Sequence, residues 1–319
     1  MKNLLSKIFI RHLALLLIFS QNVICEANDF TFFNPIQLNS AFAGSGKTIR
    51  STYSYTDQWS ALPGSFLTNN FALDFNLEQL NSGVGFSTSL WKGGVASFQQ
   101  NNFDLHYAYR LKIGDSTALC FGMRAGYLQN NFSDDYTFIS DIVGGESPVL
   151  NSEQDGVLNL GAGIGLFSSN YWFGYAVNHL NQSELSSQKL NVQHQLHGSY
   201  LVNFTLNAFG TNHYCSLHPV FNLSYQTQNT QFDVGAYAVV DIVIFGAFYQ
   251  LGSKGELQEK AYHNAPSFSI GFYEHNVVIN YMLTIEPALG NSHQIGLFYE
   301  IDTVKRRLKN QNALFFPSM

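Results

Sequence analysis

The chain has 319 residues, of which 45% are apolar, 15% aromatic and only 12% charged, and its formal net charge is −6. This apolar content excludes an intrinsically disordered chain, and the slight negative charge excludes a general affinity for nucleic acid. The charged fraction is about half of what soluble domains carry. No segment after residue 27 has the ~18 consecutive apolar residues of a transmembrane helix, so the aromatic, glycine-rich composition favours β-structure in a membrane.

The first 27 residues have the layout of a secretory signal peptide. Three basic residues precede an apolar run at 13–19, and small or tolerated residues follow at Cys25 and Ala27. The run is too short for an uncleaved helical anchor. Cys25 is an alternative lipidation site, although none of the three residues before it is small. We expect residues 1–27 to direct export, and the mature protein to reside in a bacterial cell envelope.

Alternation of apolar and polar residues dominates the rest of the chain. Between 103 and 112 the odd positions are Phe, Leu or Tyr, and the even positions are polar or small. A period of two over this length is typical of a strand with one apolar and one polar face. Each predicted strand is long enough to cross a bilayer at a tilt. The pattern predicts fourteen strands, at 48–58, 65–76, 82–92, 101–113, 116–128, 156–168, 170–180, 193–206, 213–225, 231–240, 243–251, 266–274, 276–285 and 292–302.

The connections between these strands indicate a membrane barrel. Connections after even-numbered strands are short, and those after odd-numbered strands are mostly longer, with a short exception at 226–230. Outer-membrane barrels combine short periplasmic turns with long external loops, and a sheet in hydrocarbon must close to pair its backbone. The predicted fold class is therefore all-β, a transmembrane outer-membrane barrel of about fourteen antiparallel strands. Its lumen is wider than one layer of side chains, so it holds water, a plug or a partner.

Two segments flank the predicted barrel at 48–302. Residues 28–47 form a Phe-rich segment that either caps the barrel from the periplasm or enters it as a plug. Residues 303–319 form a tail with a basic cluster at 305–309, which we interpret as a solvated periplasmic surface near lipid head groups or a partner.

The exported chain keeps two cysteines. Alternation places Cys120 on the polar face of its strand and Cys215 on the apolar face of another. Side chains on opposite faces do not reach disulfide geometry. We predict two free thiols, with no redox role and no metal site.

A resemblance to a known family begins at residue 30, where the sequence reads FTFFNPIQLNSAFAGS. This stretch resembles the N-terminal signature of the PorP/SprF family, outer-membrane components linked to the type IX secretion system and gliding machinery of Bacteroidetes. The family signature has an aromatic residue and Asn-Pro, then Asn-Pro-Ala-Tyr-Ala-Gly. Here Asn34-Pro35 is followed by residues 39–44, with Ser40 in place of the Pro and Phe42 in place of the Tyr.

Later segments extend the resemblance to about residue 301. Gln58-Trp59 and the following Pro63-Gly64 are similar to the family's Gln-Trp and Pro-Gly region, although the Arg that precedes Gln-Trp in the family is absent. Family-like strands follow at 107–110, 120–127 and 159–182. The order and spacing of these pieces carry more weight than any one of them.

The resemblance implies a protein that acts through partners, without enzymatic activity or cofactors. Its expected role is to couple the outer membrane to periplasmic ring lipoproteins of the secretion apparatus, or to help a surface adhesin, or its C-terminal signal domain, leave the cell or become attached. Its expected surroundings are outer-membrane lipid. The residues that we expect to form a plug or to dock a partner are Asn34, Pro35, Asn39, Gly44, Gln58, Trp59 and Pro63.

Three alternatives compete with this interpretation. A passive channel or a transporter of hydrophobic solutes also suits fourteen strands with an N-terminal plug. A membrane hydrolase would use His106 with Asp104 on the lumen face, but a hydrogen-bonded network lining the barrel is the simpler interpretation. Residues 43–48, AGSGKT, lack the first Gly of a phosphate-binding loop and precede a strand.

The three Trp residues fit an aromatic girdle at the membrane interfaces better than a docking site.

Overall fold

A computed structural model describes residues 34–46, 48–61, 64–93, 98–114, 116–132, 155–186, 188–208, 210–227, 229–254, 264–286 and 290–301. The predicted signal peptide at 1–27, Pro63 and the predicted tail at 303–319 lie outside these residues. In the described part of the chain, no helix is long and apolar enough to cross a membrane.

The described chain starts with two short helical turns, α2 (Pro35–Leu38) and η2 (Ser40–Phe42), and then consists mainly of strands. A third turn, η3 (Glu78–Leu80), connects two of the strands, and β8 (Glu184–Leu185) and β9 (Gln188–Lys189) form a small separate hairpin. The strands of the main sheet are β1 (Ile49–Gln58), β2 (Phe66–Leu77), β3 (Ser82–Gly93), β4 (Phe98–Lys112), β5 (Thr117–Phe132), β6 (Asp155–Ser168), β7 (Tyr171–Asn178), β10 (Gln193–Tyr200), β11 (Val202–Ala208), β12 (Thr211–Gln226), β13 (Asn229–Val240), β14 (Val243–Lys254), β15 (Asn264–Glu274), β16 (Val277–Thr284) and β17 (Ser292–Ile301).

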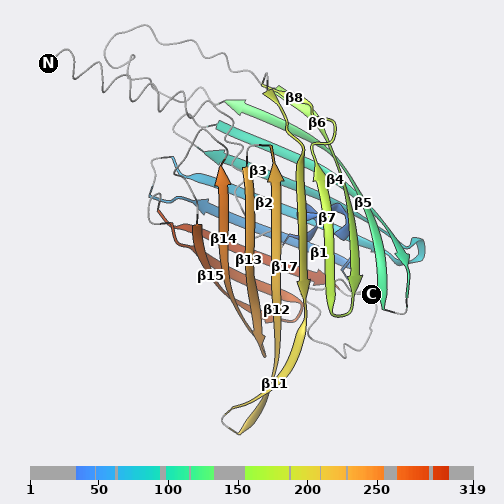
Figure 1. Cartoon of the computed structure of the whole chain (residues 1–319), viewed down its shortest axis with the longest axis vertical. Helices are drawn as coiled ribbons and strands as arrows, with labels where there is room; N and C mark the ends of the chain where they lie inside the picture. The colour runs from blue at the N-terminus through green and yellow to red at the C-terminus, as the bar shows by residue number, and fades with distance from the viewer. Residues whose placement is uncertain are drawn as a thin grey trace, which may run out of the picture.

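The main sheet closes into a barrel. Each strand pairs antiparallel with its neighbours in chain order, β17 pairs with β1, and β10 and β11 both pair with the same side of β12. β10 and β11 therefore count as one position, and the described strands make fourteen positions around the barrel (Figure 1). The predicted all-β barrel is confirmed. Closure leaves no open edge around most of the wall, as a sheet in hydrocarbon requires.

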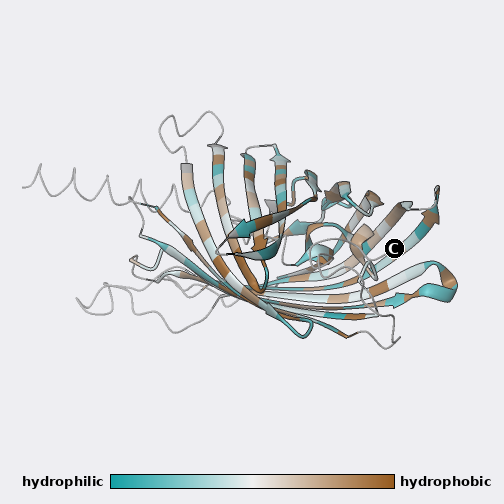
Figure 2. Ribbon diagram, turned by 90° about the horizontal axis from the view of Figure 1, so that it is seen from below, coloured by the Kyte–Doolittle hydropathy of each residue, from teal (hydrophilic) through white to brown (hydrophobic). Residues whose placement is uncertain are grey.

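Side chains alternate between the two faces of the wall, as the sequence predicts. In β4, Leu105 and Tyr107 are 66% and 47% exposed, whereas the intervening His106 is 3% exposed. Figure 2 shows the same alternation of apolar and polar residues along neighbouring strands. Apolar side chains on the outward face are suited to contact with lipid.

The two ends of the barrel have different connections. We call one end the near rim; it contains Ile49, the first residue of β1, and Ile301, the last residue of β17. The opposite end is the far rim. Near-rim turns are short, and several use a residue with positive φ, such as Asp241 at 53° and His275 at 48°. Far-rim connections are mostly longer, except the predicted short one after β12. The predicted short connection at 207–212 is shorter still in the structure, because β11 extends to Ala208 and β12 begins at Thr211.

The two halves of the lumen have different linings. Buried apolar side chains from both walls meet in the half next to the near rim, and they form one cluster that includes Tyr237, Phe248, Val278 and Phe298. The half next to the far rim is lined by buried polar side chains, among them Thr56, Asn70, Asn130, Asn178, Gln193, Asp233 and Gln250. Polar side chains therefore line the far half, whereas in the near half an inserted segment supplies an apolar surface.

Both described cysteines are free, as predicted, and both are buried. Cys120 precedes the outward-facing Phe121 and therefore faces inward. Cys215 lies two residues before the outward-facing Leu217 in β12.

Candidate functional site

Residues 34–46, which we call the inserted segment, lie within the near half of the barrel. Pro35 begins α2, where its fixed φ and its missing N–H fit the first helical position. Asn39 interrupts the helical path with an extended backbone, at φ −158° and ψ 123°, and its side-chain oxygen accepts a hydrogen bond from Ala41 N at 2.9 Å. This cap begins η2. The segment therefore forms two compact turns on either side of Asn39.

Glycines in the wall make room for this segment. A Cβ at Gly122 on β5 would overlap the backbone of Ala41, and a Cβ at Gly83 on β3 would overlap the backbone of Ala43. A Cβ at Gly163 on β6 would overlap the side chain of Asn39. Glycine within a strand often marks a place where another backbone approaches closely. Here three neighbouring regions of the wall share that property and form the floor on which the inserted segment rests.

Asn39 attaches the middle of the segment to β6, β7 and β10. Its Nδ2 lies 3.2 Å from the carbonyl oxygen of Ile164, 3.4 Å from that of Tyr175 and 3.1 Å from Nε2 of His197. The Asn39 side chain is 1% exposed. A buried amide that finds partners for both its oxygen and its nitrogen avoids the cost of an unsatisfied polar group.

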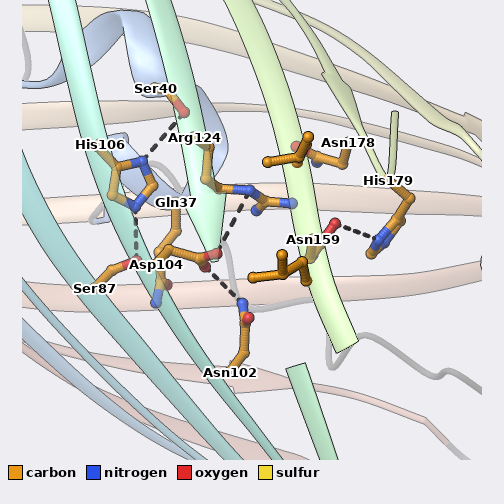
Figure 3. Close-up of polar contacts among 12 residues, drawn as sticks. Gln37, Ser40, Ser87, Asn102, Asp104, His106, Arg124, Asn159, Asn178 and His179 are labelled. Atoms are coloured by element: carbon orange, nitrogen blue, oxygen red, sulfur yellow. Dashed lines mark hydrogen bonds and ion pairs between the residues drawn. The ribbon is translucent and has the colours of Figure 1, made fainter. Parts of the chain in front are cut away.

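Asn34 and Ser40 attach the segment to other strands. Asn34 Oδ1 accepts a hydrogen bond from Thr52 Oγ1 at 2.9 Å. Ser40 Oγ lies 3.1 Å from Nδ1 of His106, whose Nε2 lies 2.8 Å from Oγ of Ser87, as Figure 3 shows. His106 thus connects the segment to the wall through both ring nitrogens, in a hydrogen-bonded network.

The contacts described for Asp104 are to residues other than His106. Its Oδ1 lies 3.7 Å from Nε of Arg124, and its Oδ2 accepts a hydrogen bond from Asn102 at 2.6 Å (Figure 3). These contacts agree with the simpler interpretation of this region, in which a polar hydrogen-bonded network lines the barrel.

Charged groups hold the C-terminal end of the segment. Gly44, at φ +67°, donates its N–H to Asp74 Oδ2 at 2.7 Å, and its carbonyl oxygen accepts a hydrogen bond from Arg110 Nη2 at 2.6 Å. Arg50 contacts both carboxylate oxygens of Asp74 and donates to the carbonyl oxygen of Phe42 at 3.0 Å. Charge-assisted hydrogen bonds of this kind are stronger than neutral ones. A side chain at position 44 would be strained by its φ and would overlap Gly83.

The apolar side of the segment packs across the lumen. Ile36, Leu38 and Phe42 are 1%, 2% and 3% exposed and belong to the same cluster as the inward-facing residues of the opposite wall. The Phe42 ring makes edge-to-face contacts with Phe167 and Trp172, with ring centroids 4.9 Å and 5.1 Å apart. Such pairs are among the favourable aromatic arrangements. The segment thus joins the two walls of the barrel through one apolar core.

The predicted site residues separate into two groups. Asn34, Pro35, Asn39 and Gly44 lie together in the inserted segment, while Gln58 ends β1 at the far rim and faces inward. Asn34 bonds to Thr52 in β1, and the six residues from there to Gln58 span roughly 20 Å of strand. The two groups do not form one site.

Trp59 follows Gln58 at the far rim. Its ring contacts Phe66 edge to face at a centroid distance of 5.3 Å, and Phe66 stacks on Trp91 at 5.2 Å. Burial raises the pKa of the Glu286 carboxyl, and a hydrogen bond from the Trp59 side chain opposes this shift. The prediction that Trp91 belongs to an aromatic girdle is wrong. Trp91 lies between the exposed Leu90 and Lys92 in β3, so its side chain is on the inward face.

The girdle interpretation is also wrong for Trp172. This residue is 4% exposed and contacts Phe42 inside the barrel, because β7 turns its Tyr171, Phe173 and Tyr175 side outward. The alternation in the sequence would have revealed this. Sequence reasoning also missed Arg50, Asp74 and the three floor glycines. These residues lie beside the inserted segment only because of the register in which their strands pair.

The described residues include no group of three or more His, Cys, Asp or Glu side chains that could hold a metal ion.

Comparisons with solved structures give only distant similarities. CdiB from Acinetobacter baumannii is 8% identical with a TM-score of 0.45, over 79% of this chain and 60% of its own length. Omp33 from Acinetobacter baumannii is 10% identical with a TM-score of 0.43, over 81% and 100%. The TodX monoaromatic hydrocarbon channel, in a deletion mutant, is 9% identical with a TM-score of 0.46, over 81% and 90%.

Comparison at the level of sequence is more specific. No curated protein matches the chain. Residues 23–301 match the family described as type IX secretion system membrane protein PorP/SprF, which agrees with the resemblance in the N-terminal signature and extends over the whole described barrel. The chain belongs to the PorP/SprF family of type IX secretion system membrane proteins.

Proposed function

We propose that this protein is a non-enzymatic outer-membrane component of the type IX secretion system that works through protein–protein contacts. It couples the outer membrane to periplasmic ring lipoproteins, or it assists the secretion or surface attachment of an adhesin-like cargo. Family membership supports the secretion role. The outward apolar side chains of the wall support an embedding in lipid.

The observation that carries this proposal is the apolar core that the inserted segment forms across the lumen. Ile36, Leu38 and Phe42 are almost fully buried against residues from both walls. A conducting pore needs a continuous polar path, whereas this arrangement favours a closed barrel whose surfaces carry the function. With an even number of strands and both ends of the barrel chain at the near rim, the near rim faces the periplasm.

The test starts from the full exported chain, affinity-tagged and solubilised from the outer membrane. We expect co-purification with periplasmic proteins of the secretion apparatus, and we expect deletion of the gene to leave one or a few surface adhesins inside the cell. A matched variant that lacks residues 34–46 tests the closed lumen. We expect the intact protein in reconstituted vesicles to conduct poorly and the variant to conduct more.

The alternative, a passive channel or a transporter of hydrophobic solutes, predicts a different result. It requires the intact protein to conduct ions or to take up solute in the same vesicles, and its deletion to leave secretion unchanged. That pair of outcomes would overturn the secretion proposal.

A further inference from the structure

The three arginines of the described chain all face the lumen, and two of them hold the inserted segment. Arg50 and Arg110 donate hydrogen bonds to backbone carbonyl oxygens of that segment. The third, Arg124 in β5, lies two residues beyond Gly122 towards the far rim, and so on the far-rim side of the segment. Its side chain is 9% exposed. Arg124 therefore has a role other than holding the segment.

The guanidinium of Arg124 has hydrogen-bonding capacity to spare. Its contact with Asp104 is an ion pair in which Oδ1 lies 3.7 Å from Nε, beyond hydrogen-bond distance (Figure 3). Nε is buried without a hydrogen-bond partner among the described residues. Asp104 instead accepts a hydrogen bond from Asn102 at 2.6 Å. A guanidinium carries five N–H donors in a planar fork, and a buried charged donor without a partner is costly. Most of the fork thus remains available to a ligand.

The wall beside the guanidinium leaves space for its side chain. Arg124 pairs with Gly161 in β6, and a Cβ there would lie 3.2 Å from Nε of Arg124 and 3.2 Å from Oδ1 of Asn178. Figure 3 shows the guanidinium extending from β5 across β6 towards Asn178. The glycine therefore lets the arginine lie over β6, with its Nη end away from β5.

The charges around Arg124 favour a ligand with a single negative charge. Asp104 already balances part of the charge of the arginine, and a dianion such as phosphate would also face the Asp104 carboxylate. The neighbouring Asn159 and Asn178 are buried but uncharged. A planar carboxylate matches the guanidinium fork at two points, which gives strong and directional charge-assisted hydrogen bonds.

We propose that Arg124 anchors a binding site for a carboxylate group, which enters the lumen from the far rim and accepts hydrogen bonds from the two Nη groups. Entry from the near rim is blocked by the apolar core that the inserted segment forms with both walls. The site goes beyond the proposed secretion role and does not depend on it. A small organic acid and the C-terminus of a polypeptide offer the same carboxylate chemistry, and the experiment has an arm for each.

The test is equilibrium dialysis of the full-length exported protein in detergent, at neutral pH and low salt. The probes are radiolabelled butyrate and butyramide, which is its uncharged isostere. We expect butyrate to bind saturably and butyramide to bind weaker by about tenfold or more, because hydrogen bonds between charged groups are stronger than neutral ones. Inorganic phosphate should compete poorly with butyrate.

Substitutions at the site separate binding from folding. Arg124→Gln should weaken butyrate binding by about tenfold or more, because the charge and the fork are both lost. Lys92→Gln, which removes an exposed cation from β3, should leave it unchanged. Asp104→Asn should strengthen butyrate binding by about threefold, since it removes a competing carboxylate. Folding is checked by the shift in gel mobility on heating, and Asp104→Asn keeps the proposal testable if Arg124→Gln does not fold.

A matched pair of short uncharged peptides, one with a free C-terminus and one amidated, identifies the source of the carboxylate. Displacement of butyrate by the free peptide alone supports a polypeptide end, and displacement by neither peptide supports a small acid. The proposal is overturned if butyrate does not bind saturably, if butyramide binds equally well, or if phosphate displaces butyrate at equal concentration. Unchanged butyrate binding in Arg124→Gln, or weaker binding in folded Asp104→Asn, also overturns it. Co-purification with secretion proteins tests the proposed function separately.

Discussion

Arg50 on β1 and Asp74 on β2 form a two-point ion pair inside the barrel, with Nε 2.8 Å from Oδ1 and Nη2 2.9 Å from Oδ2. Their side chains are 7% and 3% exposed. The pair also binds the inserted segment, because Asp74 accepts the N–H of Gly44 and Arg50 donates to the carbonyl oxygen of Phe42. The same two residues therefore connect neighbouring strands and hold the segment in place.

We expect Asp74→Ala to destabilise the folded barrel by about 3–5 kcal/mol, because it leaves the Arg50 guanidinium buried without its carboxylate. The measurement is the midpoint of unfolding by guanidinium in detergent or vesicles. Glu274→Gln is the control, since the Glu274 side chain is 71% exposed and should contribute little. Equal midpoints for Asp74→Ala and the wild type would contradict a structural role for the pair.

We expect Gly122→Val to displace the inserted segment, because even a Cβ at this position overlaps the backbone of Ala41. Gly296→Val is the matched control in β17, where the nearest atom to an added Cβ is 4.0 Å away. The measurements are conductance in reconstituted vesicles and protease cleavage within residues 34–46. Both should rise in Gly122→Val and stay at the wild-type level in Gly296→Val. A Gly122→Val protein that remains closed and resistant would show that the segment does not rest on this floor.

We expect Phe42→Ala to lower the free energy of unfolding by about 3–5 kcal/mol, as a large-to-small change in a packed core does. Phe42 fills the space between Phe167 and Trp172, so its loss leaves a cavity. Phe173→Ala is the control, because Phe173 is 44% exposed on the outward face and lipid can fill the space. If Phe173→Ala proves as destabilising as Phe42→Ala, the core across the lumen does not stabilise the barrel as described.

We expect Glu286→Gln to reduce the dependence of stability on pH. Burial raises the pKa of Glu286 above its ordinary value of 4.5. The folded state then binds the proton more tightly than the unfolded state, so this group's contribution is fully present below the unfolded pKa and is lost as the pH rises through the folded pKa. Gln keeps an acceptor for Trp59 without a charge.

The measurement for Glu286→Gln is the guanidinium midpoint across the acid-to-neutral range. The variant should be more stable than the wild type at pH 7 and nearly equal to it below the unfolded pKa. A difference that grows as the pH falls would have the wrong sign and would contradict the burial of this carboxyl.

The strands and their outward faces were predictable from sequence, because the period of two is a local property of each segment. Residues 103–112 specify both faces of β4 without reference to any other strand, and the same holds for β16 and β17. The connection between β11 and β12 was predicted too long, because polar Asn207 and Asn212 are typical loop residues although they pair in the hairpin. The inward direction of Trp172 was also available from local alternation.

By itself, the sequence determined a membrane barrel with an apolar outer face and the family to which its motifs belong. It also predicted that Asn34, Asn39 and Gly44 form a plug or dock a partner. Only the tertiary structure decided where these residues rest. The floor of Gly83, Gly122 and Gly163, and the Arg50–Asp74 pair, come from strands far apart in the chain. Their meeting depends on the pairing register of the whole barrel, which is a non-local property.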